Sequence, residues 1–224
     1  MALIKSISGI RGTIGGQPGH ALTPVDAVAF AAAYGSWLKE TYASTGRIKV
    51  VLGRDARPSG PFVQGLVENT LLALGIDVID LDLSTTPTVE MEVVAQGAQG
   101  GIILTASHNP VHWNALKLLN HRGEFISAAD GQALLERVVA QEYSFVEVHE
   151  LGTKIFVHDA LERHVEAVLQ LPLVDVPAIR ACKFKIVVDA VNSTGGIAVP
   201  LLLDALGCEV EELYCAPNGQ FPHN

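Results

Sequence analysis

A serine and a histidine follow directly on a short apolar segment, and their residue types could support covalent chemistry. Residues 100–104 read Gly-Gly-Ile-Ile-Leu and are followed by Thr105, Ser107, His108 and Asn109, with a proline next. A short β-branched run bounded by glycines and a proline predicts a buried strand that stops abruptly. Ligands of open α/β sheets bind outside the carboxyl ends of the strands. The hydroxyl of Ser107 is therefore a candidate nucleophile.

Two other interpretations of this segment have to be weighed. Ser-His-Asn-Pro also suits an ordinary turn, because each of these residue types is common in turns. A serine hydrolase would need a base beside Ser107. His108 is its neighbour in the chain, so on an extended backbone the two side chains point to opposite faces. The chain also has no G-x-S-x-G elbow, and both observations argue against a hydrolase triad.

A second candidate is Arg11, which stands in the sequence Ser8-Gly9-Ile10-Arg11-Gly12. We expect a strand or hairpin with a tight glycine loop around this arginine. Glycines allow backbone N–H groups to approach an anion closely, and a guanidinium can bind a phosphate through two hydrogen bonds. The alternative is a hairpin turn whose arginine is solvated. The spacing is not G-x-G-x-x-G, so it indicates no dinucleotide site.

Further polar residues follow other predicted strands. The strand 46–53 runs into a loop that contains Arg54, Asp55 and Arg57. These residues could line a cleft, or could form a local Arg–Asp ion pair with a serine capping the next helix. After the serine segment come Asn114 and Lys117. A lysine here can hold a phosphate as a point charge, and it can equally be an ordinary charge at a strand edge.

Composition limits the classes of partner. The chain has 224 residues, 49% of them hydrophobic, and a net charge of −9. An acidic protein of this kind is not expected to bind nucleic acid or an anionic membrane surface. Its three cysteines are too few and too irregular for a disulfide framework or a zinc site. The amino terminus has no signal-peptide layout, so a cytoplasmic location is predicted.

The order of predicted elements indicates an α/β fold. Helices are predicted at 23–41, 61–74, 86–96, 127–141 and 156–171, with strands between them. This alternation predicts a three-layer α/β/α domain with a mixed sheet over residues 1–150. Residues 151–224 are expected to begin a second, similar domain, with strands at 185–189 and 209–214. The glycine-rich loop 190–196 between those strands lacks a Walker lysine, so capping and close packing are the favoured interpretation.

Three motifs together resemble those of the α-D-phosphohexomutases, which include phosphoglucomutase, phosphomannomutase and phosphoglucosamine mutase. Residues 105–110, Thr-Ala-Ser-His-Asn-Pro, are similar to the family's phosphoserine loop. Residues 53–60 match its G-R-D-x-R-x-S-G segment, and residues 8–12 resemble its S-G-x-R-G loop. One departure is Ala115, which stands where family members commonly have the glycine of N-G-x-K.

The resemblance implies a mechanism and roles for these residues. Ser107 would carry a phosphoryl group and exchange it with a hexose phosphate through a hexose 1,6-bisphosphate. Arg11 and Lys117 would neutralise phosphoryl charge, and His108 would assist proton transfer or orient the loop. The supporting residues would be Thr105, Asn109, Arg54, Asp55, Arg57 and Asn114.

The resemblance also implies Mg²⁺, bound by the phosphate on Ser107 and by aspartates of a D-x-D-x-D-R loop. This chain has no such loop, and it lacks the family's sugar-binding and distal phosphate-binding loops. We therefore expect an amino-terminal portion of a longer enzyme, inactive by itself, whose missing carboxy-terminal domains are its partners. Two alternatives stay open: phosphoglucosamine mutase as the activity, and a non-catalytic sugar-phosphate-binding module.

Overall fold

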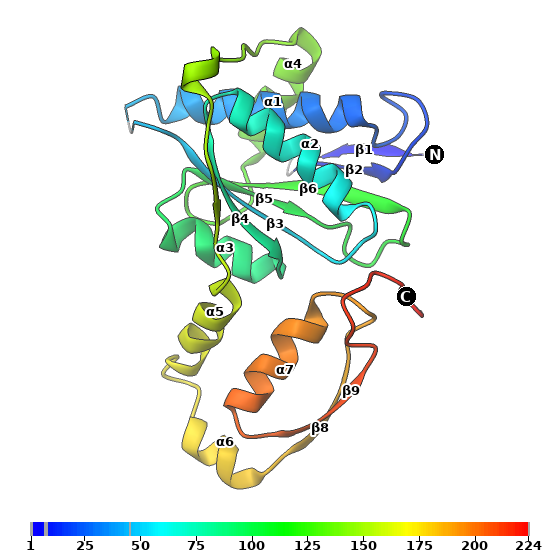
Figure 1. Cartoon of the computed structure of the whole chain (residues 1–224), viewed down its shortest axis with the longest axis vertical. Helices are drawn as coiled ribbons and strands as arrows, with labels where there is room; N and C mark the ends of the chain where they lie inside the picture. Colours follow the sequence, from blue (N-terminus) through cyan, green and yellow to red (C-terminus); the bar gives the residue numbers. More distant parts are fainter. Residues whose placement is uncertain (1, 7–8, 45, 224) are drawn as a thin grey trace.

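The computed structural model describes residues 2–6, 9–44 and 46–223, which form a larger and a smaller α/β unit (Figure 1). The strands of the larger unit are β1 (Leu3–Ser6), β2 (Gly9–Thr13), β3 (Lys49–Arg54), β4 (Asp77–Leu83), β5 (Gly100–Leu104), β6 (Trp113–Leu119) and β7 (Lys154–Phe156). Its helices are α1 (Pro24–Thr41), α2 (Gly60–Ala73), α3 (Thr86–Ala95), α4 (Ala128–Ala140) and the 3-10 turn η1 (Val148–Glu150).

The larger unit is built on one mixed sheet with the strand order β1-β2-β6-β5-β3-β4-β7. Strands β5, β3, β4 and β7 run parallel, whereas β1, β2 and β6 join by antiparallel pairing. The mixed sheet predicted from the sequence is thus confirmed. The carboxyl ends of β3 and β5 lie side by side, so the loops that follow them meet at one edge of the sheet.

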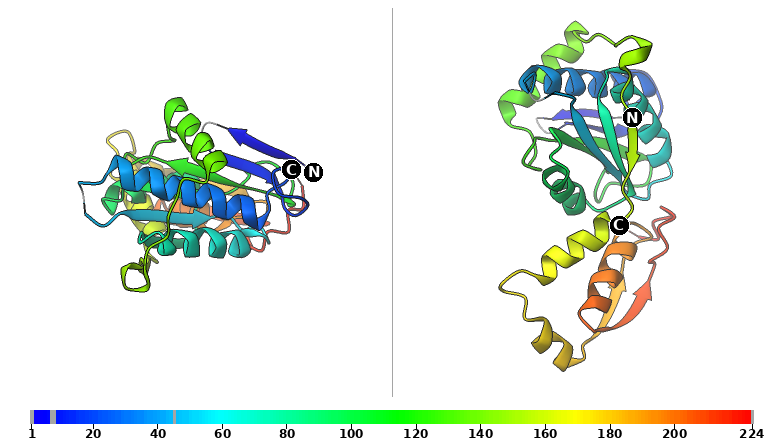
Figure 2. Two further views of the ribbon diagram at one scale, coloured as in Figure 1. Left: turned by 90° about the horizontal axis from the view of Figure 1, so that it is seen from above. Right: turned by 60° about the vertical axis from the view of Figure 1, so that its left-hand side comes forward.

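Helices cover both faces of this sheet, which confirms the three-layer prediction (Figure 2). Alternate strand residues face opposite sides: Val50 and Leu52 pack in the core formed with α1, α2 and α4, and Val51 packs in the core beneath α3. Local signals set the helix starts. Thr23 and Asp26 form a capping box at α1, and Ser127 forms another with Asp130 at α4.

The two glycines that begin β5 are required by close packing. A Cβ on Gly100 would lie 2.1 Å from the hydroxyl of Tyr34. That buried hydroxyl donates to the carbonyls of Gly101 (3.1 Å) and Leu119 (2.6 Å). Helix α1 therefore sits directly on β5 and β6. These two strands flank residues 105–112, the serine loop, so α1 helps to hold both ends of that loop.

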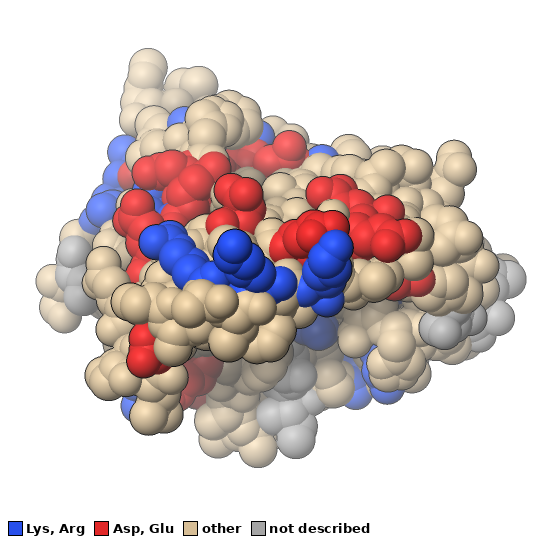
Figure 3. Space-filling view, turned by 90° about the horizontal axis from the view of Figure 1, so that it is seen from below, with Lys and Arg blue, Asp and Glu red and all other residues tan. Residues whose placement is uncertain are grey.

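The smaller unit begins a second α/β arrangement. Its elements are α5 (Ala160–Leu169), α6 (Val176–Cys182), β8 (Lys185–Asp189), α7 (Gly195–Ala205) and β9 (Glu209–Leu213). Strands β8 and β9 are parallel and are joined through α7. On the face in Figure 3, basic side chains border acidic ones instead of forming one continuous positive surface. Within the described residues, no helix is long and apolar enough to cross a bilayer.

One local prediction is wrong and another is right only in part, for related reasons. The helix predicted over 156–171 begins only at Ala160, because Lys154–Phe156 forms β7 and pairs with β4. The strand or hairpin predicted around Arg11 is confirmed, since β1 and β2 pair antiparallel, but the arginine lies within a strand and not in a tight glycine loop. Arg11 lies in the middle of β2, between Ile4 on β1 and Ala115 on β6. Ser8, the first residue of that motif, lies outside the described residues. In both segments, pairing with a distant strand overrides the local pattern.

The domain division has to take β7 into account. The boundary predicted at residue 150 falls before this strand, and the pairing of β7 with β4 adds residues 154–156 to the first sheet. We therefore propose that the first domain ends between Phe156 and Ala160, just before α5.

Candidate active site

The serine loop leaves β5 at Leu104 and turns sharply at Ser107. Ser107 has a φ of 54°, in the left-handed region that residues other than glycine seldom adopt. Its backbone N–H donates to Oγ1 of Thr105 at 3.1 Å. The N–H and the side-chain amide of Asn109 both donate to the carbonyl of Ala106, at 3.1 and 2.8 Å. The tight turn leaves Ser107 and His108 exposed while Thr105 and Ala106 are buried.

Arg57 reaches this loop from the end of β3 and is itself fully buried. Its guanidinium donates to the carbonyls of Pro110 (2.6 Å), Trp113 (3.0 Å), Ser107 (2.8 Å) and Asn109 (2.7 Å). Its Nε donates to Asp55 Oδ2 at 3.0 Å, and Asp55 Oδ1 accepts from the N–H of Arg57 at 3.0 Å. Sequence reasoning described Arg57 as one support among several. In the structure, Arg57 binds four carbonyls of residues 107–113 and so stabilises the conformation of the loop.

The other supporting residues take different positions. Arg54 donates to Gln64 at 2.9 Å and pairs with Asp82 at 2.5 Å, so it faces away from the serine loop. Asn114 is buried in β6 and donates to Ser59 Oγ at 3.0 Å. Ser59 makes no side-chain capping bond to α2, although an Arg–Asp pair does form, between Arg57 and Asp55. The expected ion pair is confirmed, and the expected serine cap is wrong.

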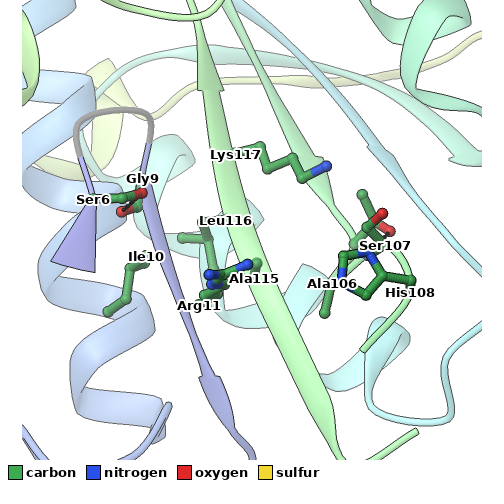
Figure 4. Close-up of a pocket in the computed structure, with 11 residues that line it drawn as sticks. Ser6, Gly9, Ile10, Arg11, Ala106, Ser107, His108, Ala115, Leu116 and Lys117 are labelled. Carbon is green, nitrogen blue, oxygen red and sulfur yellow. Dashed lines mark hydrogen bonds between the residues drawn. The ribbon is translucent and has the colours of Figure 1, made fainter. Parts of the chain in front are cut away.

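A pocket of about 360 Å³ lies beside the serine loop, over β2 and β6 (Figure 4). Arg11, Lys117, Thr105, Ser107 and His108 all line it. Arg11 pairs with Ala115 across the two strands, so strand alternation puts it and Lys117 on the same face of the sheet. The side chain of Lys117 extends from β6 toward the loop that carries Ser107. Residues of β2, of the loop after β5 and of β6 are thus brought together.

Among the residues that the structure describes, no carboxylate is bound to the two cations in this pocket. Within the described residues, neither Arg11 nor Lys117 forms an ion pair, although Lys117 is only partly exposed. Burial lowers the pKa of Lys117, and the neighbouring Arg11 lowers it further, while Asp55 and Glu90 oppose the shift. A partly buried cation without a partner is destabilised until an anion approaches it. The pocket is therefore prepared for a ligand with negative charge.

His108 is less constrained than the serine beside it. It is exposed and lines the pocket, and no hydrogen bond from another described residue orients its ring. A general base normally has such an orienting partner. Ala115, which departs from the N-G-x-K pattern, lies in β6, is 4% exposed and does not have a positive φ.

A second cavity, of about 410 Å³, separates the serine loop from the smaller unit. It is lined on one side by Asp55, Ser107 and Asn109, and on the other by residues of the 190–195 loop together with Phe221 and His223. Sequence reasoning missed Phe221 and His223, because nothing near them in the chain points to Ser107. His223 bonds to Asp189 at 2.9 Å, which joins the last described segment to β8.

The described residues do not by themselves provide a magnesium site. No group of three or more His, Cys, Asp or Glu side chains in the described part of the chain converges as a metal cluster. Asp55 lines the cavity that contains Ser107, but both of its carboxylate oxygens accept hydrogen bonds from Arg57. A Mg²⁺ ion needs about six oxygen ligands, and the described residues do not bring that many together.

Comparison with protein families gives two matches. Residues 3–144 match a family described as phosphoglucomutase/phosphomannomutase, alpha/beta/alpha domain I. Residues 162–224 match the domain II of the same description. The first match contains the serine loop, Arg11, Arg57 and Lys117, and the second begins within α5.

Individual relatives agree with these matches. The chain is 33% identical to a phosphoglucomutase/phosphomannomutase of Thermococcus kodakarensis, over 94% of this chain and 46% of the relative. It is 33% identical to a probable phosphoglucosamine mutase of Methanopyrus kandleri, over 96% of this chain and 44% of the relative. A solved structure from Burkholderia thailandensis, of a phosphoglucomutase/phosphomannomutase family protein, superposes with a TM-score of 0.75 at 28% identity. That likeness covers 99% of this chain and 47% of the other. The chain thus spans about half the length of the relatives it matches.

Proposed function

Because the chain belongs to the phosphoglucomutase/phosphomannomutase family, the α-D-phosphohexomutases, we propose that Ser107 accepts and returns a phosphoryl group in the isomerisation of a hexose phosphate. The observation that carries this proposal is the pocket itself. An exposed serine hydroxyl, held in a strained turn, lines the same pocket as Arg11 and Lys117, which have no ion-pair partner among the described residues.

In the proposed reaction, a hydroxyl oxygen of the hexose phosphate bonds to the phosphorus of phosphorylated Ser107. The bond between phosphorus and Ser107 Oγ breaks, the sugar hydroxyl loses its proton, and Ser107 Oγ gains one. The product is a hexose 1,6-bisphosphate. After the bisphosphate turns round, its other phosphoryl group returns to Ser107, and the isomeric monophosphate leaves.

The chain's own residues would contribute positioning and charge, which dominate phosphoryl transfer. Arg11 presents a planar fork that can hold two phosphoryl oxygens, and Lys117 presents a point charge. Both lie on rigid strands and not on loops, so their positions need little reorganisation when the charge moves. His108 could carry the proton to or from Ser107, since the two residues line one pocket.

The substrate is proposed only as a class. Relatives are named for glucose, mannose and glucosamine phosphates, and phosphoglucosamine mutase is the alternative activity. The polar groups of the pocket are suited to phosphate and do not distinguish these sugars. More than half of each of these relatives lies beyond the matched part, and we propose that their sugar-selecting and Mg²⁺-binding groups belong there.

The test compares the wild-type product of the complete natural reading frame with Ser107→Ala. With Mg²⁺ and a hexose 1,6-bisphosphate, the wild type should interconvert the 1- and 6-phosphates of at least one hexose and carry phosphate on Ser107 by peptide mapping. Ser107→Ala should lose at least about a thousandfold in turnover. The exposed Ser144 is the matched control, and Ser144→Ala should behave as wild type.

Two results would contradict the proposal in different ways. Undiminished turnover in Ser107→Ala would remove Ser107 from the reaction. Binding of hexose phosphates by the wild type, with neither isomerisation nor phosphate on Ser107, would favour the non-catalytic sugar-phosphate-binding module.

A further inference from the structure

Every N–H donor of the Arg57 guanidinium has an acceptor in the structure. A guanidinium has five N–H donors, and those of Arg57 go to one carboxylate and four carbonyls of the segment 107–113. Carbonyl dipoles that converge on one point repel each other unless a cation lies between them. The shape of this segment therefore depends on Arg57.

The strained backbone of Ser107 makes this dependence functional. A left-handed conformation costs a residue other than glycine free energy, and it persists only where neighbouring groups hold it. The holding bonds here are those from Arg57 to the carbonyl of Ser107 and from the N–H of Ser107 to Thr105. If Arg57 lost its hydrogen bond to the carbonyl of Ser107, the turn would relax and the Ser107 hydroxyl would leave the pocket that contains Lys117.

Phe221, from the smaller unit, covers Arg57. The centre of its ring lies 5.0 Å from the guanidinium carbon, within the range of a cation–π contact. The segment around it also approaches the first unit closely. A Cβ on Gly219 would lie 2.1 Å from the carbonyl oxygen of Ala56, and Gly219 has a φ of +71°. The smaller unit thus touches the first unit at the loop that carries Arg57.

The same segment is tied back to its own unit. The N–H of Gly219 donates to the backbone carbonyl of Asn192 at 2.9 Å, and the side-chain amide of Asn192 donates to the carbonyl of Gln220 at 2.8 Å. Asn192 itself follows β8. A movement of the smaller unit therefore carries Phe221 with it, toward or away from the guanidinium.

We propose that Arg57 is a positioning residue for Ser107, and that Phe221 makes its grip depend on the docking of the smaller unit. Docking places the ring over the guanidinium and keeps water from its bonds to the loop carbonyls. Withdrawal admits water to those bonds and loosens the turn at Ser107. The catalytic meaning of this coupling rests on the proposed function, whereas the coupling itself is a property of the fold.

The primary test uses amide hydrogen exchange on the product of the natural reading frame, because exchange measures local opening without any need for activity. Phe221→Ala should speed exchange in peptides that span residues 105–113 by about tenfold, between the effects of an exposed and of a fully desolvated cation–π contact. Peptides of β3 should be unchanged. Phe221→Tyr, which keeps the ring, should stay within about twofold of wild type, and Phe221→Leu should fall between the two.

Phe62 provides the matched control, since it is an exposed phenylalanine on α2 that lines neither cavity at the serine loop. Phe62→Ala should leave exchange in residues 105–113 unchanged. Unchanged exchange in Phe221→Ala would overturn the coupling. So would an equal acceleration throughout the first unit, because that pattern means general destabilisation.

Kinetics then test the positioning role. In an active enzyme, Phe221→Ala and Arg57→Lys should lower kcat while leaving KM within about twofold, since a misplaced nucleophile loses transition-state interactions and keeps substrate binding. Phe221→Tyr should restore kcat. A rise in KM with kcat unchanged would overturn the positioning role. An inactive wild type would refute the proposed function, and the exchange experiment would still decide the coupling.

Discussion

Two cationic regions lie close to Ser107, and they differ in what they bind. Arg57 is fully buried and directs all its donors to protein oxygens. Arg11 and Lys117 line the pocket and have no ion-pair partner among the described residues. A satisfied cation specifies the shape of the protein, and an unsatisfied one is available to a ligand. The same type of charge therefore builds the loop in one region and awaits an anion in the other.

The largest expected effect is on stability, from Arg57→Met. This change leaves the buried carboxylate of Asp55 and four carbonyls without their donor. Removing one partner of a buried ion pair typically costs about 3–5 kcal/mol of unfolding free energy. Urea denaturation measures it. Arg122→Met is the control: its exposed pair with Glu124 is screened by solvent and should contribute little to the stability. Equal losses in the two variants would contradict the structural role of Arg57.

Lys117→Met should have the opposite profile. The lysine contributes charge to the pocket and no ion pair to the described part of the fold, so its removal should not lower the unfolding free energy at neutral pH. Turnover should fall about a hundredfold to a thousandfold, the usual loss when one charge-stabilising donor is removed. Paired kinetic and urea measurements check both. A large loss of stability with normal turnover would mean that Lys117, like Arg57, stabilises the fold and does not serve a ligand.

The pH dependence of Lys117 sharpens the same contrast. Burial, together with Arg11, lowers the pKa of Lys117 in the folded state below its ordinary value of 10.5. The unfolded chain therefore binds more protons than the folded one between these two pKa values, so stability rises with pH in that window. The stability of wild type relative to Lys117→Met should therefore increase as the pH rises toward 10.5. A difference that is constant or falls with pH would contradict the shift.

A smaller effect is expected for Ser107→Gly, measured against Ser107→Ala. Both variants remove the hydroxyl and should abolish turnover. Glycine adopts a φ of 54° without strain, whereas alanine keeps the penalty. The glycine variant should therefore be more stable than the alanine variant by about 1 kcal/mol. Thermal unfolding of the two variants is the measurement, and equal midpoints would mean that the turn at Ser107 is not strained.

The smallest effect is expected for Ala115→Gly, which restores the residue that family members commonly carry. Ala115 is buried in β6 and pairs with Arg11. Glycine in a strand interior costs about 0.5–1 kcal/mol relative to alanine. A loss of this size by urea denaturation supports the strand. A gain in stability would indicate a positive φ at this position, as in a loop.

The elements that sequence patterns predicted well are those with local signals at their ends. Helix α1 starts at Pro24 and α4 at Ala128, each within one residue of the predicted start. The run before Ser107 forms a fully buried strand. Such features depend on residues within one or two turns of each other, so the sequence contains them directly.

Long-range pairing is where the patterns failed. At Arg11 the predicted strand is present but the predicted tight glycine loop is not, because β1 and β6 pair with β2 on its two sides. Phe156 was expected to begin a helix, yet it ends β7, which pairs with β4. Strand formation depends on partners far away in the chain, and no local window contains them.

The sequence by itself determined which residues could do the chemistry: a serine in a turn after a strand, and cations among glycines and at strand positions. Only the tertiary structure decided their roles. It placed Arg11 and Lys117 on one face of the sheet beside Ser107, and it turned Arg57 inward to the loop carbonyls beneath Phe221. The physical reason is that the role of a charge depends on its burial and its partners, and folding alone sets both.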